Sequence, residues 1–205
     1  MRRLPLLPTL IVTGAVAVMI ALGVWQLRRA AWKDRLLADY AVAATMPALD
    51  LDPLRAGSSA LPPLAFRRVL ITCRAEDVAP EWRGGRSRAG QSGYVALVPC
   101  RPAADGLAGR VIVNAGWAAL PGRERRISLV GIVAGTLGAD EQGEPLILTA
   151  ATPAAPLTAS APARIEDVPN NHRMYAAQWF FFAAVAVLIY LLALRRRRRE
   201  LPPEP

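Results

Sequence analysis

The chain has 205 residues and a formal net charge of +9, with 25 Lys+Arg against 16 Asp+Glu. Residues 28–173 hold 18 Lys+Arg and 14 Asp+Glu, a net +4, while Arg2 and Arg3 supply +2 and the last eleven residues +3. Because much of the surplus lies in the two tails beside apolar runs, the charge indicates membrane topology and excludes nucleic acid as the expected partner.

The first apolar run, Leu6 to Leu27, is 22 residues long and contains no charge. Roughly 20 apolar residues in a helix cross the hydrocarbon core of a bilayer. A cleaved signal peptide is the alternative, since Arg2 and Arg3 precede the run. Such a peptide is shorter and ends in a small-x-small cleavage site, which Gly23–Leu27 does not offer. The sequence therefore predicts a retained transmembrane helix.

The helical pattern continues beyond this run through Trp32 to Tyr40, with Leu36 and Leu37 in phase. Met46-Pro47 and the proline-rich stretch around Pro53, Pro62 and Pro63 are expected to end it.

From Phe66 onwards short β-branched runs alternate with glycine or proline turns, which is typical of a small antiparallel β domain, a sandwich or a barrel. The expected strands are Arg68–Cys73, Tyr94–Cys100, Arg110–Asn114, Ile127–Thr136 and Leu146–Leu148. Glu81–Gly93 is polar and glycine-rich and is predicted to be a loop. Cys73 and Cys100 could form a disulfide in an oxidising compartment, or remain two separate buried thiols.

Ala150 to Ala163 consists mainly of alanine, proline, serine and threonine, so it is predicted to be a semi-extended linker or excursion. The second uncharged run, Met174 to Leu194, is 21 residues long and is followed by five arginines, Arg195 to Arg199. This pattern indicates a second transmembrane helix with a cytoplasmic stop.

The fold class expected is thus a membrane protein with N- and C-terminal transmembrane helices flanking a small antiparallel β-rich extracytoplasmic domain. Its predicted segments are a cytoplasmic tail (1–5), helix 1 (6–27), an extension and connection (28–65), the β domain (66–149), a linker (150–173), helix 2 (174–194) and a basic tail (195–205). Arg28, Arg29, Lys33 and Arg35 after the first run favour the opposite orientation. The long loop and the five arginines outweigh them, so both termini are placed in the cytoplasm.

Common catalytic motifs are missing from the sequence: there is no Gly-x-Ser-x-Gly elbow, no phosphate-binding loop and no His-Glu-x-x-His. The single histidine, His172, has no evident serine nucleophile beside it. The sequence therefore does not predict an enzyme.

Polar and aromatic side chains gather where each apolar run meets its outer boundary. Trp25, Gln26, Arg28 and Arg29 close the first run, while His172, Tyr175 and Trp179 share a helix face at the start of the second. An interfacial belt explains the aromatic and cationic residues. It explains Gln26 and His172 less well, because a polar group near hydrocarbon requires a protein partner or a ligand.

These stretches resemble the surfeit locus protein one family of assembly factors for haem-copper cytochrome c oxidase. Three motifs carry the resemblance: Gly23–Lys33, similar to Gly-x-Trp-Gln-x-x-Arg-x-x-Trp-Lys; Val111–Trp117, similar to Val-Asn-Arg-Gly-Trp; and Asn170–Phe180, similar to Asn-Asn-His-x-x-Tyr-Ala-x-x-Trp-Phe. Ala115 and Arg173 depart from the family's usual arginine and apolar residue.

The resemblance implies a multi-pass bacterial inner-membrane protein, its central domain periplasmic, that assists insertion of haem a into the oxidase's catalytic subunit. His172 would ligate the haem iron, with Tyr175, Trp179, Trp25, Gln26, Arg28 and Arg29 around the cofactor. The expected partners are that catalytic subunit, membrane lipid and the haem a synthesis machinery. A scaffold without cofactor, stabilising an oxidase assembly intermediate, is the alternative.

Overall fold

The computed structural model describes residues 5–54, 63–100, 106–122, 125–138 and 146–200. The predicted tail residues 1–4 and 201–205, and Pro62 in the proline-rich stretch, lie outside these ranges. The chain forms two compact units, Met1–Leu36 with Pro169–Pro205, and Leu37–Val168.

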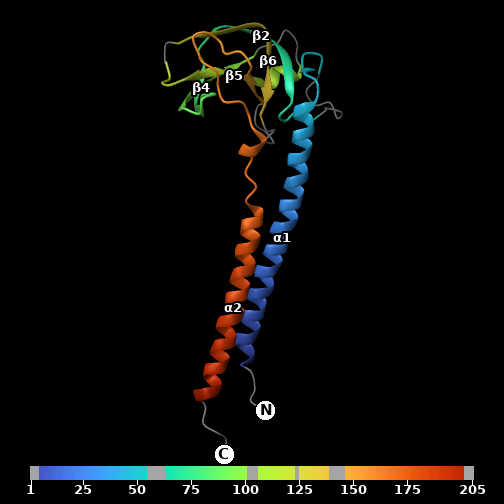
Figure 1. Cartoon of the computed structure of the whole chain (residues 1–205), viewed down its shortest axis with the longest axis vertical. Helices are drawn as coiled ribbons and strands as arrows, with labels where there is room; N and C mark the ends of the chain where they lie inside the picture. The colour runs from blue at the N-terminus through green and yellow to red at the C-terminus, as the bar shows by residue number, and fades with distance from the viewer. Residues whose placement is uncertain (1–4, 55–62, 101–105, 123–124, 139–145, 201–205) are drawn as a thin grey trace, which may run out of the picture. The chain divides into compact units, whose positions relative to one another are not determined.

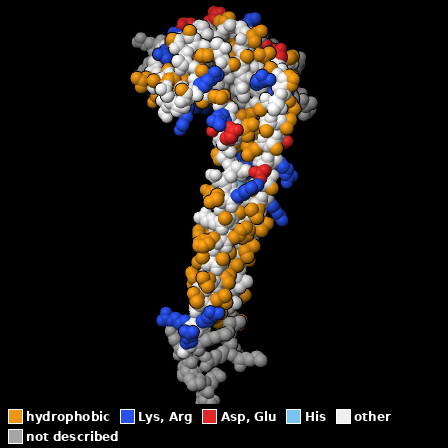
Figure 2. Space-filling view, viewed as in Figure 1, with side chains coloured by type: hydrophobic (Ala, Val, Ile, Leu, Met, Phe, Trp, Pro, Cys, Tyr) orange, Lys and Arg blue, Asp and Glu red, His pale blue; other side chains and the backbone are white. Residues whose placement is uncertain are grey.

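The first unit is an antiparallel pair of helices, α1 (Leu6–Thr45) and α2 (His172–Glu200), with α1 continuing into the second unit (Figure 1). The end of α1 at Thr45 agrees with the expected stop at Met46-Pro47. Both helices are long and apolar enough to cross a membrane, and most of their apolar stretch is exposed. Apolar side chains cover most of the visible face of the pair (Figure 2). The described residues thus contain two candidate spans, which corrects the expected multi-pass architecture to two-pass.

A narrow seam joins the two helices. Their less exposed positions recur every three or four residues, at Thr9, Val12, Val16, Met19, Gly23, Gln26, Ala30 and Lys33 on α1, and at His172, Ala176, Trp179, Ala183, Ala186 and Tyr190 on α2. This spacing is that of a heptad seam between paired helices. At Gly23 an added Cβ would lie 2.6 Å from the ring of Phe180, so glycine lets the helices approach closely.

The second unit is built on one seven-stranded sheet with the order β1-β2-β6-β7-β5-β4-β3. The strands are β1 (Leu49–Asp50), β2 (Arg68–Val78), β3 (Glu81–Arg86), β4 (Ser92–Pro99), β5 (Val111–Ala118), β6 (Ile127–Leu137) and β7 (Leu146–Ala150). The β1–β2 and β5–β7 pairs are parallel and the other four are antiparallel. The expectation of an antiparallel domain was therefore wrong: the sheet is mixed, because β7 pairs with β5 instead of closing a meander.

The sheet curls strongly around a single main core. Strands β2 and β4 are four positions apart in its order, which in a flat sheet would separate them by roughly 19 Å. Yet Cys73 on β2 and Cys100 just after β4 are joined by a disulfide, with their Cα atoms 5.1 Å apart. Both cysteines are buried in the core with Ile71, Val98 and Val113. The disulfide thus links opposite parts of the curled sheet, and this resolves the alternative that the sequence left open.

The segment expected to be a loop, Glu81–Gly93, contains strand β3, so that prediction was wrong for its first half. Gly84 and Gly85 pair with Tyr94 and Gly93 of β4. A Cβ at Gly85 would lie 2.6 Å from a methyl group of Val95. Glycine here permits close strand pairing and does not mark a turn.

The segment predicted to be a linker, Ala150–Ala163, packs onto the sheet. Ala154 donates its N–H to Ala115, and Thr158 exchanges backbone hydrogen bonds with Trp117 at 2.7 and 3.0 Å. Leu157 is buried in the core. The expectation failed because backbone hydrogen bonds, which leave no side-chain pattern, hold this segment in place.

Gly116 makes that docking possible. It has a positive φ of 143°, and an added Cβ would lie 2.7 Å from Leu157 Cβ and 2.8 Å from the carbonyl oxygen of Thr158. Asn114 accepts hydrogen bonds from the Gly116 N–H at 3.2 Å and from the Ser160 hydroxyl at 2.9 Å. Residues 154–160 therefore pack against the Asn114–Gly116 stretch of β5, where the pairing with β4 shifts register.

We expect Gly116→Ala to lower the free energy of unfolding by about 2 kcal/mol, because it adds both backbone strain and a steric clash. Gly84→Ala is the matched control, since its Cβ meets nothing within 4 Å. Denaturant unfolding of the full chain in detergent measures both variants. Equal midpoints for the two would contradict the assigned role of Gly116.

Candidate functional site

The polar site predicted at the boundary of the apolar runs centres on His172. This residue begins α2 and occupies the first position of the seam. Its Nδ1 atom lies 2.8 Å from Oε1 of Gln26 on α1, across a sequence separation of 146 residues. When Gln26 accepts this hydrogen bond, Nδ1 carries the proton and the neutral ring keeps its lone pair on Nε2.

His172 therefore presents one bound and one available nitrogen. Within the described part of the chain, no hydrogen bond is formed by Nε2. A histidine that ligates a metal commonly donates its other ring N–H to an oxygen acceptor, which fixes the ring orientation. The Gln26–His172 pair has this arrangement, so the donor chemistry fits an axial ligand of haem iron.

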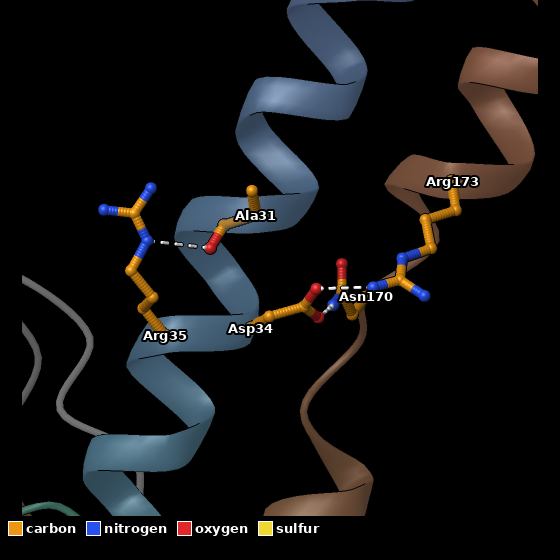
Figure 3. Close-up of polar contacts among 5 residues, drawn as sticks. All are labelled: Ala31, Asp34, Arg35, Asn170 and Arg173. Atoms are coloured by element: carbon orange, nitrogen blue, oxygen red, sulfur yellow. Dashed lines mark hydrogen bonds and ion pairs between the residues drawn. The ribbon is translucent and has the colours of Figure 1, made fainter.

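Asp34 is a functional candidate that the sequence did not reveal. It lies two turns beyond Gln26 on α1, and its carboxylate contacts two residues at the start of α2 (Figure 3). Asn170 Nδ2 donates to Oδ1 at 2.8 Å, and Arg173 Nη2 donates to Oδ2 at 2.7 Å. The carboxylate thus balances the Arg173 charge next to His172. The residues around Asp34 in the sequence do not indicate that it pairs with Asn170 and Arg173, because it lies inside a basic stretch of α1.

Four of the other predicted site residues are exposed. Trp25 and Tyr175 are 55% and 52% exposed. Arg28 and Arg29 are also exposed, and the Arg29 guanidinium lies 3.9 Å from the ring centroid of Trp32. These four side chains are of the aromatic and cationic types that form an interfacial belt.

Trp179 is half-buried on the seam and contacts Phe182 edge-on, with ring centroids 6.4 Å apart. Tyr175 lines an open hollow of about 530 Å³ on α2 together with Met174, Gln178 and Phe181. His172 does not line this hollow. Of the seven predicted residues, Gln26 and His172 are joined by a hydrogen bond within the described part of the chain.

No group of three His, Cys, Asp or Glu residues that could hold a metal ion occurs among the residues described.

The middle motif, Val111–Trp117, lies within β5 and contributes buried structure. Ala115, at the position where an arginine is usual in the resembled family, is fully buried, and its carbonyl accepts the Ala154 N–H at 2.8 Å. A small side chain suits this site because it faces the core.

The described chain thus combines an antiparallel pair of candidate membrane helices, a histidine held at the seam between them, and a curled, disulfide-linked β domain. This is the class of a helix-anchored β-domain protein. The model of the SURF1 family matches residues 13–184, and the chain belongs to this family. The family is associated with cytochrome c oxidase assembly and is not a known catalytic family. No curated protein matches the chain.

We expect Asp34→Ala to destabilise the helix pair by about 1 kcal/mol, because it removes one hydrogen bond and one ion pair. The effect is modest since Arg173 is 74% and Asp34 41% exposed in their side chains. Asp39→Ala, on the same helix and without a partner in the part of the chain described, is the control. Denaturant midpoints in detergent compare them, and an equal shift in both variants would remove Asp34 from the site.

Proposed function

We propose that this protein assists the insertion of haem a into the catalytic subunit of cytochrome c oxidase, with His172 as a transient ligand of the haem iron. The observation that carries the proposal is the 2.8 Å contact between His172 Nδ1 and Gln26 Oε1. It fixes the imidazole and leaves Nε2 available for an iron atom.

The neighbouring residues have complementary roles. Gln26 orients the ring, and Asp34 offsets the positive charge of Arg173 beside it. Arg28 and Arg29 are exposed cations on α1 that suit the propionate groups of haem, and Trp25 and Trp179 offer aromatic surface for the macrocycle. A single protein ligand favours a carrier, because the cargo must also be released.

The proposal places the two helices in the bacterial inner membrane, with both termini in the cytoplasm and the β domain in the periplasm. Support comes from two candidate spans and from the Cys73–Cys100 disulfide, since disulfides persist mainly in oxidising compartments. The partners proposed are the oxidase's catalytic subunit, membrane lipid and the haem a synthesis machinery.

A scaffold without cofactor is the second candidate. The seam contact between Gln26 and His172 satisfies two polar groups with each other, as a purely structural helix pair requires. Thr9 and Tyr190 form a similar contact elsewhere on the seam. In a scaffold, His172 would matter only through its hydrogen bond.

The His172→Asn variant separates the two functions, because its side-chain amide can still donate to Gln26 but offers no imidazole Nε2. For a haem carrier, we expect this variant to lose most of the haem a that copurifies with the wild-type protein. The visible spectrum and haem-to-protein ratio, after coexpression with haem a synthesis, measure this directly.

Tyr190→Phe is the matched control, since it removes a seam hydroxyl contact and leaves His172 intact. It should retain the wild-type spectrum. If His172→Asn also kept an unchanged haem ratio and ligand-field spectrum, His172 would not be the ligand. Negligible haem in the folded wild-type protein would favour the scaffold.

The disulfide tests the proposed orientation. In cells quenched with acid and then denatured, we expect Cys73 and Cys100 to resist alkylation until a reductant is added. Both cysteines are buried, so the reagent must be applied after denaturation. Cys73→Ala is the control, because its single Cys100 should react without reduction. Free thiols in the wild-type protein from fresh cells would place the β domain in a reducing compartment.

A further inference from the structure

A basic cleft on the β domain lies outside the helix pair and its histidine. Its volume is about 880 Å³, and its lining includes Arg86, Arg88, Arg164 and Asp167. With Asp167 and the Glu166 carboxylate beside Arg164 counted, the three arginines leave one net positive charge. Arg164 pairs with Glu166 at 3.1 Å. Arg86 and Arg88 have no ion-pair partner in the described part of the chain, so they are the cations available to a ligand.

The backbone holds these two arginines in a fixed arrangement. Arg86, the last residue of β3, and Arg88, in the turn that follows, are both exposed and line the cleft, while Ser87 between them is 5% exposed. The Arg88 N–H donates to Ala159 at 2.9 Å, and the Ala161 N–H donates to Arg86 at 2.8 Å. The Ser87 hydroxyl accepts from the Gln91 N–H at 3.1 Å.

A second, smaller pocket of about 330 Å³ adjoins the cleft, since Arg88 and Pro162 line both. Its other lining residues include the small or apolar Ala134, Ala150 and Ala151. Arg68 is the other charged residue of the smaller pocket, so the two neighbouring pockets offer guanidinium groups beside small and apolar side chains. Such a site suits an amphipathic anion.

We propose that this cleft binds the phosphate of an anionic phospholipid headgroup. Arginine forks match phosphate oxygens in geometry and charge. The volume lies in the range of small-ligand pockets, roughly 300–1,000 Å³, whereas protein partners generally need a broad contact surface. Only residues 168–171 separate Asp167 of the cleft from the start of α2, a candidate membrane span. Phospholipid is the amphipathic phosphate most abundant around a membrane-anchored chain.

Native mass spectrometry of the full chain in detergent, titrated with phosphatidylglycerol or phosphatidylcholine, tests the assignment. We expect preferential binding of phosphatidylglycerol, weakened about tenfold or more in the Arg86→Gln/Arg88→Gln variant. The matched control, Arg74→Gln/Arg110→Gln, removes two exposed arginines outside the cleft and should stay within about twofold of wild type. An intact Cys73–Cys100 disulfide verifies folding in each sample.

Competition distinguishes the sources of phosphate. Inorganic phosphate and glycerol 3-phosphate, at the concentration of the lipid, should leave lipid binding unchanged. Displacement by either would overturn the lipid assignment in favour of a soluble phosphate compound. Unchanged lipid binding in the Arg86→Gln/Arg88→Gln variant would overturn it too, and loss of copurifying oxidase subunits in that same variant would identify a protein-docking surface instead. The outcome is independent of haem binding, because apo protein is used throughout.

Discussion

Polar groups at an apolar helix interface must find hydrogen-bond partners. This requirement determines which side chains face one another in the first unit. A glutamine or histidine facing hydrocarbon alone would cost free energy, so the seam is stable only if its polar positions oppose one another. Gln26 and His172 do so near one end, and Thr9 and Tyr190 do so farther along. Small residues such as Gly23 and Ala176 allow this contact, because they bring the backbones close enough for short polar side chains to meet.

A different constraint organises the β domain, namely that buried backbone groups must be hydrogen-bonded. The positive φ of Gly116 and the side chain of Asn114 allow another segment of the chain to pack against β5. The segment that docks there continues to Ser160 and Ala161. It forms backbone hydrogen bonds with Arg86 at the end of β3 and with Arg88 in the turn that follows. The Val111–Trp117 motif is thus structural in this chain. Its hydrogen bonds hold the docked segment, and the hydrogen bonds of that segment in turn hold a wall of the basic cleft. The motif supplies no cation of its own.

Local composition was enough to predict both helices, because an uncharged run of 21 or 22 residues determines its structure with little help from the rest of the chain. It also located the cores of five strands through their β-branched residues, although Val130 and Ile132 of β6 are exposed. Strand β3 was missed because Trp82 and its glycines lack that alternation. The parallel β5–β7 pair depends on residues distant in sequence, which single-sequence patterns do not encode. The misfit of His172 and Gln26 with an interfacial belt singled out two residues that form a hydrogen bond. Asp34 was not singled out, since only its position opposite Arg173 distinguishes it from any solvated carboxylate.

That pairing also bears on the chain's departure from its family at position 173. An unbalanced guanidinium beside the imidazole would repel a cationic iron centre. The Asp34 carboxylate, whose Oδ2 lies 2.7 Å from Nη2 of Arg173, would reduce that repulsion. Asp34 holds Asn170 as well, so one side chain both offsets the charge and fixes the turn that leads into α2. The substitution is therefore compatible with a ligand role for His172. A carrier and a scaffold share all of these contacts and differ in a single atom, Nε2, which takes no part in the seam. The chemistry of that atom, more than the stability of the helix pair, decides between the two functions.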